Sequence, residues 1–310
     1  MTIAKVLPAD ATIGWMGTGL MGGFMVGHLL DAGYRVHVHN RTRAKAEPLV
    51  ARGAKWAEGP RALADAADVV VTMVGLPSEA EATFSGPEGA LTRARPGQLF
   101  IDMSTNRPSL SRLFADMATS RGAFALDAPV SGGQAGAQAS TLSIMIGGDE
   151  TAFAAADPMF RTLGNTIVHH GGPGSGQHAK LVNQTLIAGA MVGVCEGLLY
   201  ARAAGLDMNR VLASVEKGAA GSWSLSQYAP RIQAGDFEPG FLVEHFLKDM
   251  GIALAEARRL QLSLPGLALA EQLYRAVDAQ GYARKGTHAL MLALSNLSAT
   301  DWSARPVISH

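Results

Sequence analysis

The sequence predicts an α/β domain with a doubly wound, mostly parallel sheet, followed by an all-helical domain. Short β-rich runs alternate with helical patterns over the first half of the chain, which is typical of strand–helix–strand units. Several runs are apolar without polar alternation, as at Val69-Val70-Val71, and this favours strands buried on both faces. A glycine-rich cluster at residues 171–176 then ends the strand pattern, and only helical periods follow.

The expected elements follow from this reading. Strands are predicted at residues 11–17, 35–40, 68–74, 99–104, 124–130, 142–147 and 166–170. Helices between them are predicted at residues 22–32, 43–52, 109–120 and 151–162. In the second half, helices are predicted at residues 177–204, 208–217, 224–234, 247–259, 267–279 and 287–297. We therefore expect one domain at residues 1–172 and a helical domain at residues 173–310 that begins with a long helix.

The composition disfavours several classes of protein. The chain has 310 residues, with 26 basic and 26 acidic side chains, so its formal net charge is zero. A neutral balance gives no electrostatic footprint for nucleic acid or an anionic membrane. The nearest approach to a membrane span, at residues 186–195, is shorter than the required length of about 20 residues. The single cysteine, Cys195, cannot form an internal disulfide, which suits the reducing cytoplasm.

A glycine-rich loop follows the first predicted strand and opens the first predicted helix. Gly17, Gly19 and Gly22 form the pattern GxGxxG. The first glycine permits a tight turn, the second lets the backbone approach a pyrophosphate, and the third lets helix and strand pack closely. The helix N-terminus would then offer free N–H groups to the anion. A purely structural turn is the alternative, but the strand–turn–helix position favours a Rossmann-type dinucleotide site.

The end of the second predicted strand indicates which dinucleotide is preferred. An NAD site places Asp or Glu about 20 residues beyond the glycines, where it binds the ribose 2′-hydroxyl. Here Asn40, Arg41 and Thr42 stand in that region. These side chains can hydrogen-bond a 2′-phosphate, and Arg41 adds positive charge. We therefore expect NADP, with NAD less favoured; the alternative for Arg41 is a solvated surface residue.

With these residues assembled, the chain resembles the β-hydroxyacid dehydrogenase family, relatives of 6-phosphogluconate dehydrogenase. The family includes 3-hydroxyisobutyrate dehydrogenase, tartronate semialdehyde reductase and the reductases that act on glyoxylate and succinic semialdehyde. Four motifs occur in the family's order over nearly the whole chain. They are the loop at residues 14–22, Asp-Ala-Pro-Val-Ser-Gly-Gly at 127–133, Gly-Ser-Gly-Gln-His-Ala-Lys-Leu-Val-Asn-Gln at 174–184, and Lys248-Asp249.

The resemblance assigns the substrate site. Lys180 matches the family's catalytic lysine and would act as general acid and base; a snorkelling surface lysine is the alternative. On a helix, Lys180, Asn183 and Gln184 share one face, and the two amides match substrate-binding positions. The residues that match the turn binding the substrate carboxylate are Ser131, Gly132 and Gly133. A hydroxyl followed by two small residues leaves backbone N–H groups available to an anion, although a simple tight turn has the same pattern.

Further positions match cofactor contacts of the family. Thr105 matches a residue near the nicotinamide ribose, and Lys248 matches a lysine at the cofactor end of the active site. An ordinary ion pair with Asp249 or Glu244 is the alternative for Lys248. No metal site is expected. The remaining cofactor positions lie in the glycine loop and in a loop after the third predicted strand: Thr18, Leu20, Met21, Leu76 and Pro77.

The resemblance implies hydride transfer between NADP and a small 3-hydroxy acid or its semialdehyde. Imine reductases share the expected architecture, but they usually carry Asp or Tyr where this chain has Lys180. A cofactor-binding scaffold without catalysis is a third hypothesis, and the presence of Lys180 and Ser131 disfavours it. The family is typically dimeric or tetrameric, so we expect a homodimer or homotetramer. Gly189, Gly193 and Gly197 recur every four residues and indicate a helix packed closely against a neighbour.

Overall fold

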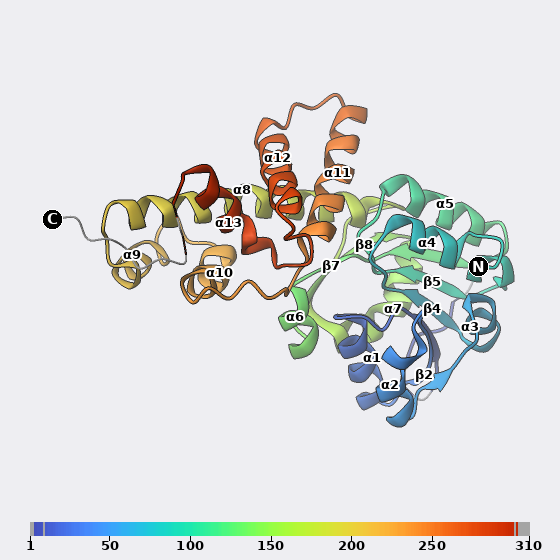
Figure 1. The fold of residues 1–310 in the computed structure, drawn as a ribbon. Coiled ribbons are helices and arrows are strands. Elements are labelled where there is room, and N and C mark those ends of the chain that lie inside the picture. Colours follow the sequence, from blue (N-terminus) through green and yellow to red (C-terminus); the bar gives the residue numbers. More distant parts are fainter. Residues whose placement is uncertain (1–2, 9, 301, 303–310) are drawn as a thin grey trace. The chain divides into compact units, whose positions relative to one another are not determined.

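The computed structural model describes residues 3–8, 10–300 and 302 of the chain. They divide into two compact units, Met1–Lys180 (unit 1) and Leu181–His310 (unit 2). The division falls inside the longest helix, α8 (Ser175–Ala203), because the first turns of α8 pack in unit 1. Figure 1 labels the elements of each unit where there is room.

The described part of unit 1 is built on a nine-stranded sheet with the order β3-β2-β1-β4-β5-β6-β8-β7, in which β9 also pairs with β8. Neighbouring strands from β3 to β6 are parallel. Strand β8 is antiparallel to β6 and β7 and parallel to β9. The predicted, mostly parallel sheet is confirmed, and the antiparallel pairs are confined to the side of the sheet that contains β8. The strands are Thr12–Met16 (β1), Arg35–His39 (β2), Lys55–Trp56 (β3), Val69–Thr72 (β4), Leu99–Asp102 (β5), Phe124–Asp127 (β6), Val130–Ser131 (β7), Leu142–Gly148 (β8) and Gly164–His169 (β9).

Helices cover both faces of this sheet, as Figure 1 shows. Val69 and Val71 of β4 pack into the core beneath α1, α2 and α7, and Val70 packs into the core beneath α3, α4 and α5. Since successive side chains of a strand point to opposite faces, a strand between two helix layers is apolar throughout. The helices are Gly22–Asp31 (α1), Arg43–Lys45 (η1, a 3-10 turn), Glu47–Ala51 (α2), Pro60–Ala66 (α3), Pro77–Phe84 (α4), Ala90–Arg93 (η2), Pro108–Thr119 (α5), Gly133–Ala139 (α6) and Glu150–Leu163 (α7).

Prolines divide two elements that the sequence analysis predicted as continuous. The helix expected at residues 43–52 separates into η1 and α2, because Pro48 lacks an N–H and fits only the first turn of a new helix. The strand expected at residues 124–130 separates into β6 and β7 around Ala128-Pro129. Helices α3, α4 and α6 were not predicted, since each spans at most eight residues and shows little periodicity.

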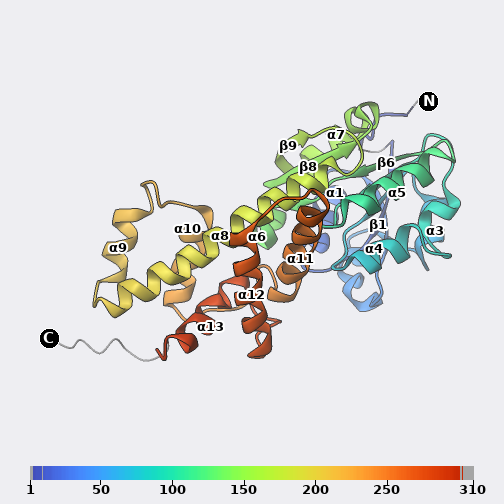
Figure 2. The same cartoon turned by 90° about the horizontal axis from the view of Figure 1, so that it is seen from above.

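Unit 2 is helical, as predicted, and its described residues carry one isolated bridge between Leu242 and Gly286. Figure 2 shows α11 and α12 side by side. Helices α8, α10, α11, α12 and α13 supply the buried core, with Phe246 and Tyr274 in edge-to-face contact at 5.0 Å between ring centroids. After α8, the elements are Met208–Val215 (α9), Trp223–Gln233 (α10), Val243–Arg259 (α11), Pro265–Ala279 (α12), Thr287–Ala289 (η3) and Leu290–Leu297 (α13).

Helix α8 is, among the described helices, the one long and apolar enough to cross a membrane by length and composition. The core helix of a folded domain has the same properties, and Met191 and Cys195 of α8 are fully buried in the core of unit 2. The three glycines at residues 189, 193 and 197 do not mark close packing within the chain. A Cβ at any of them would meet nothing within 4 Å, because the core-facing positions belong to the apolar residues between them.

Candidate active site

The glycine loop between β1 and α1 has the geometry that the sequence predicts. Gly17 has a φ of +99°, and a Cβ there would overlap the carbonyl oxygen of Met73. A Cβ on Gly22 would overlap the carbonyl oxygen of Gly17, so both positions require glycine. At Gly19 a Cβ would meet nothing within 4 Å, which leaves the backbone open to a ligand. The first turn of α1 holds no acidic side chain, so its N-terminus suits a pyrophosphate.

Asn40 joins this loop to the turn after β2. Its Oδ1 accepts a hydrogen bond of 3.0 Å from the backbone N–H of Thr18, and its Nδ2 donates one of 2.9 Å to the carbonyl oxygen of Thr42. Both ends of the amide are therefore engaged with the backbone. The structure brings the predicted residues Thr18, Asn40 and Thr42 together, while Leu20 lies 51% exposed on the loop and Met21 packs partly into the core.

Arg41 contacts an acidic residue that the sequence analysis missed. Its side chain is 87% exposed and forms an ion pair of 2.7 Å with Glu79 of α4. The other oxygen of Glu79 accepts hydrogen bonds from the N–H groups of Gly75 and Leu76, which precede α4. Proline at the first helical position with glutamate two residues later is a helix-start signature that could have revealed Glu79.

The loops after β4 and β5 are joined to each other. The N–H of Val74 donates to Oγ of Ser104 at 3.0 Å. Leu76 and Pro77 follow in the first loop, and Leu76 is 44% exposed. Thr105 follows Ser104 in the second loop and is half-buried. Because both loops leave the carboxyl ends of adjacent parallel strands, they lie at the same edge of the sheet as the glycine loop.

The predicted carboxylate turn lies between β7 and α6. Ser131 ends β7, and Gly132 and Gly133 have φ values of +125° and +60°, a region that favours glycine. The far end of α6 is held by His28 of α1, whose Nε2 lies 3.0 Å from the carbonyl oxygen of Ala137. This contact fixes the helix that follows the turn against the helix that follows the glycine loop.

Lys180 lies in the second turn of α8, and its side chain is buried, with 7% exposed. The start of α8 is tied to the sheet by a buried residue whose role the sequence analysis did not assign. Asp127, at the end of β6, accepts hydrogen bonds from the N–H groups of Gly174 and Gln177, at 2.7 and 2.8 Å. Burial raises the pKa of the Asp127 carboxyl, and these backbone hydrogen bonds oppose the rise.

Three residues predicted for the substrate or cofactor gather in unit 2 around Asp249. Gln184 is 1% exposed, donates to Oδ2 of Asp249 at 2.6 Å, and accepts from Nδ2 of Asn183 at 2.8 Å. Lys248 forms an ion pair of 2.8 Å with Oδ1 of Asp249. Asp249, itself 1% exposed, was noted only as the neighbour of Lys248. Within the described part of the chain, no group of three or more His, Cys, Asp or Glu side chains could hold a metal ion.

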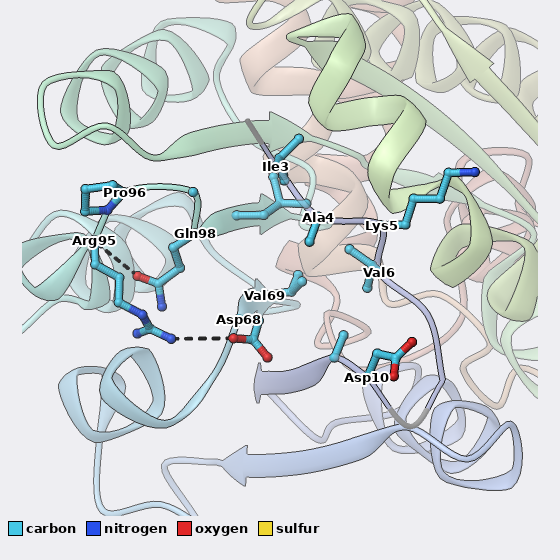
Figure 3. A pocket seen from close by; sticks show the side chains of 13 residues that line it. Ile3, Ala4, Lys5, Val6, Asp10, Asp68, Val69, Arg95, Pro96 and Gln98 are labelled. Atoms are coloured by element: carbon cyan, nitrogen blue, oxygen red, sulfur yellow. Dashed lines mark hydrogen bonds and ion pairs between the residues drawn. The ribbon is translucent and has the colours of Figure 1, made fainter. Parts of the chain in front are cut away.

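The opposite edge of the sheet has a cavity of about 390 Å³ at the start of β1, β4 and β5 (Figure 3). Arg95 and Asp68, two charged residues that line it, form hydrogen bonds with backbone groups of the fold. The guanidinium of Arg95 donates to the carbonyl oxygens of Ala64 and Ala67, both at 2.6 Å, and lies 3.7 Å from Asp68. Asp68 in turn accepts from the N–H of Thr12 at 2.9 Å. None of the predicted site residues lines this cavity.

The glycine loop, the open Gly19 and the acid-free start of α1 fit a dinucleotide cofactor, and together they define a dinucleotide-binding domain. Residues 12–172 match the NAD binding domain of 6-phosphogluconate dehydrogenase. Residues 174–294 match the NAD-binding domain of NADP-dependent 3-hydroxyisobutyrate dehydrogenase. The chain belongs to the β-hydroxyacid dehydrogenase family, whose members are NAD(P)-dependent dehydrogenases of hydroxy acids.

Individual relatives agree with this assignment. The probable 3-hydroxyisobutyrate dehydrogenase-like 1, mitochondrial, of Arabidopsis thaliana is 48% identical over 294 residues, which are 94% of this chain and 88% of that protein. The 2-hydroxy-3-oxopropionate reductase of Escherichia coli (strain K12) is 36% identical over 282 residues, 91% of this chain and 96% of that protein. Mycobacterium tuberculosis 3-hydroxyisobutyrate dehydrogenase, solved with L-serine, has a TM-score of 0.82 at 31% identity, over 92% of this chain and 99% of that one.

Two further comparisons concern the alternatives. An imine reductase from Pseudomonas sp. has a TM-score of 0.62 at 19% identity, over 92% of this chain and 99% of that one, which is a likeness of fold alone. The NAD-dependent L-serine dehydrogenase of Pseudomonas aeruginosa (strain PAO1) is 36% identical over 280 residues, 88% of this chain and 94% of that protein. The family assignment therefore leaves the choice between NAD and NADP open.

Proposed function

We propose that this chain transfers a hydride between NADP and a small 3-hydroxy acid or its semialdehyde, with Lys180 as general acid and base. The observation that carries the proposal is the burial of Lys180 at the start of a helix anchored to the carboxyl edge of the sheet. Lysine side chains are mostly exposed in folded proteins, so its burial distinguishes Lys180 from a snorkelling surface lysine. Dinucleotide sites of open α/β sheets lie at this same edge.

The proposed chemistry gives each group a task. In reduction, Lys180 donates a proton to the carbonyl oxygen of the substrate, and in oxidation it accepts the proton of the hydroxyl. NADPH, when bound, supplies the hydride. The hydroxyl and backbone N–H groups of the turn at residues 131–133 hold the substrate carboxylate. Asn183 contacts the substrate, and Gln184, held by Asp249, fixes the amide of Asn183.

The preference for NADP rests on the residues after β2. Position 40 carries an amide in place of a carboxylate, and the guanidinium of Arg41 is exposed beside it. A carboxylate there would repel a 2′-phosphate, whereas a guanidinium binds it. The ion pair with Glu79 and the NAD-dependent relative favour the opposite choice. Comparable kcat/KM with NADPH and NADH would contradict the proposal.

The substrate class is tested by following absorbance at 340 nm with NADPH. The panel is glyoxylate, succinic semialdehyde, tartronate semialdehyde, methylmalonate semialdehyde and a cyclic imine. We expect turnover of an acid semialdehyde and none of the imine. Turnover of the imine alone would support an imine reductase, and NADPH binding without turnover of any compound would support a scaffold.

For the assembly, we propose a homodimer or homotetramer that uses the exposed face of α8. Val182, Leu186 and Tyr200 are 61%, 69% and 75% exposed, and the three open glycines lie at helical spacing between them. Large apolar side chains interrupted by glycine let a second helix approach closely. Light scattering should give two or four times the chain mass of 32.3 kDa, and a monomeric mass would contradict this.

A cytoplasmic location and the absence of nucleic-acid and membrane partners stay predictions. Their support is the neutral net charge and the single cysteine, which cannot form an internal disulfide. The Arabidopsis relative is named as mitochondrial. Fractionation of cells that produce the chain would decide its location.

A further inference from the structure

We propose that Gln177 and Asp127 are positioning residues that hold Lys180 in register with the loop at residues 104–106. This inference rests on the proposed role of Lys180. In this proposal, the two buried side chains fix the position of Lys180, the proton donor, relative to the loop at residues 104–106, which carries Thr105.

Gln177 joins α8 to the loop after β5 through both ends of its side-chain amide. Its Nε2 donates to the carbonyl oxygen of Ser104 at 2.8 Å, and its Oε1 accepts from the N–H of Asn106 at 2.7 Å. The side chain is fully buried, with 0% exposed. Thr105, the residue proposed to lie at the nicotinamide ribose, stands between these two contacts. A shift of the loop therefore requires a shift of Gln177.

Asp102 holds the same loop from the end of β5. Its Oδ1 accepts from the N–H of Ser104 and its Oδ2 accepts from Nδ2 of Asn106, both at 2.9 Å. The loop is thus fixed on one side by the strand that precedes it and on the other side by α8. Because every one of these groups is buried, each contact would be costly to leave unmade.

Asp127 fixes the start of α8 from a different strand. Its carboxylate accepts from the N–H groups of Gly174 and Gln177, two groups at the helix start that lack helical partners. The fit around these contacts is tight. A Cβ on Gly176 would overlap the carbonyl oxygen of Met145, and one on Gly147 would lie 2.6 Å from the N–H of Gly176.

The spacing links this anchor to the chemistry. Lys180 follows Gln177 by three residues, so the two share one face of α8 one turn apart. A proton donor and a hydride donor must act on adjacent atoms of one carbonyl group. A misplacement of about 1 Å can reduce the rate of such a reaction by about 100-fold. An anchor that holds both donors therefore affects turnover more than binding.

A matched pair of variants separates positioning from stability. Gln98 is also a buried glutamine of unit 1, 3% exposed, and its Nε2 donates to the carbonyl oxygens of Ala64 and Ala67, at 2.7 and 2.8 Å. Its Oε1 accepts from the N–H of Arg95, at the opposite edge of the sheet. Gln177→Met and Gln98→Met remove similar hydrogen bonds and should lower the Tm by similar amounts.

We expect only Gln177→Met to lower kcat, by about 10- to 100-fold. The Kd for NADPH should change less than about threefold in both variants, since the glycine loop and Arg41 are untouched. Equal kcat values in the two variants would overturn the proposal. If Gln177→Met does not fold, Asp127→Asn decides, because its amide can accept only one of the two N–H groups; a full kcat there overturns the proposal and a loss of at least tenfold supports it.

A third variant distinguishes failure of this inference from failure of the proposed function. If Lys180→Met keeps its kcat, the role of Lys180 itself is wrong. If Lys180→Met loses turnover while Gln177→Met and Asp127→Asn keep it, Lys180 is catalytic and the anchor alone is wrong.

Discussion

At the carboxyl edge of the sheet, where the parallel strands end, the buried amide of Gln177 joins α8 to the loop after β5. At the opposite, amino edge, where these strands begin, the buried amide of Gln98 donates hydrogen bonds to the carbonyl oxygens at the end of α3. The two side chains are alike in burial and in hydrogen bonding. They differ in what they connect. Gln98 connects backbone groups of a structural turn, whereas Gln177 connects α8, the helix that carries the buried Lys180, to the loop that carries Thr105.

This comparison shows that burial and full hydrogen bonding do not by themselves mark a functional residue. The amino edge has a cavity of about 390 Å³ (Figure 3), together with charged groups in Arg95 and Asp68. Those charges are paired with backbone groups of the fold. The carboxyl edge has open backbone at Gly19 and an exposed guanidinium at Arg41, which are groups that a ligand can use.

The largest effect on kcat is expected from replacing the buried Lys180, compared with replacing an exposed lysine. Lys180→Met should lower kcat by about 100- to 10,000-fold, because positioned acid–base groups contribute that much to rate. Lys217→Met, which removes the same charge from an exposed position in the turn after α9, should leave kcat unchanged. Steady-state kinetics with the best semialdehyde of the panel measures both. Equal kcat in the two variants would remove the central role of Lys180.

The stability of the carboxyl edge should depend on pH through Asp102. Burial raises the pKa of Asp102 to about 6, against hydrogen bonds from Asn106 and Ser104 that lower it. The folded state therefore holds this proton more tightly than the unfolded chain, whose Asp titrates near a pKa of about 3.9. The contribution to stability is complete below that value and is lost as the pH rises through about 6.

Asp102→Asn removes this titration. The free energy of unfolding of the unmodified chain, minus that of Asp102→Asn, should fall between pH 4 and pH 7 by an amount on the order of 2–3 kcal/mol. Urea titrations at four pH values measure the difference, so that other titrating groups cancel. A difference that stays constant with pH would show that folding does not raise the pKa of Asp102.

A smaller effect is expected where Arg41 meets Glu79. Arg41→Ala should raise the KM for NADPH by about 10- to 150-fold and leave the KM for NADH nearly unchanged, because a charge-assisted contact to phosphate contributes about 1.5–3 kcal/mol. Glu79→Gln keeps an acceptor for the start of α4 but releases Arg41, so the KM for NADPH should stay the same or fall. Equal changes for both cofactors in Arg41→Ala would place Arg41 outside the 2′-phosphate site.

Features that depend on neighbouring residues could be predicted from the sequence. The buried strands, the glycine loop and the change to helices after residue 171 each follow from local patterns of apolar residues and glycine. Contacts between distant segments could not be predicted in this way. Asp127 accepts from the N–H of Gly174, 47 residues further on, and Arg41 pairs with an acid 38 residues away. Periodicity carries no information about such pairings, which arise only when the sheet brings strand ends together.

Short elements were missed for a related reason. Helix α6 is rich in glycine and alanine and has seven residues, so its existence depends on packing against α1 through His28. The family resemblance supplied Ser131, Lys180 and Lys248 as candidates. It did not supply Asp249, whose carboxylate joins Gln184 to Lys248.

Hydrogen–deuterium exchange with and without NADPH tests most directly the claim that the carboxyl edge binds the cofactor. Peptides that cover residues 16–24, 39–43 and 103–107 should exchange more slowly when NADPH is bound. Peptides that cover residues 94–99 at the amino edge should not change. Protection confined to residues 94–99 and the adjoining cavity, with none in the glycine loop, would contradict the account.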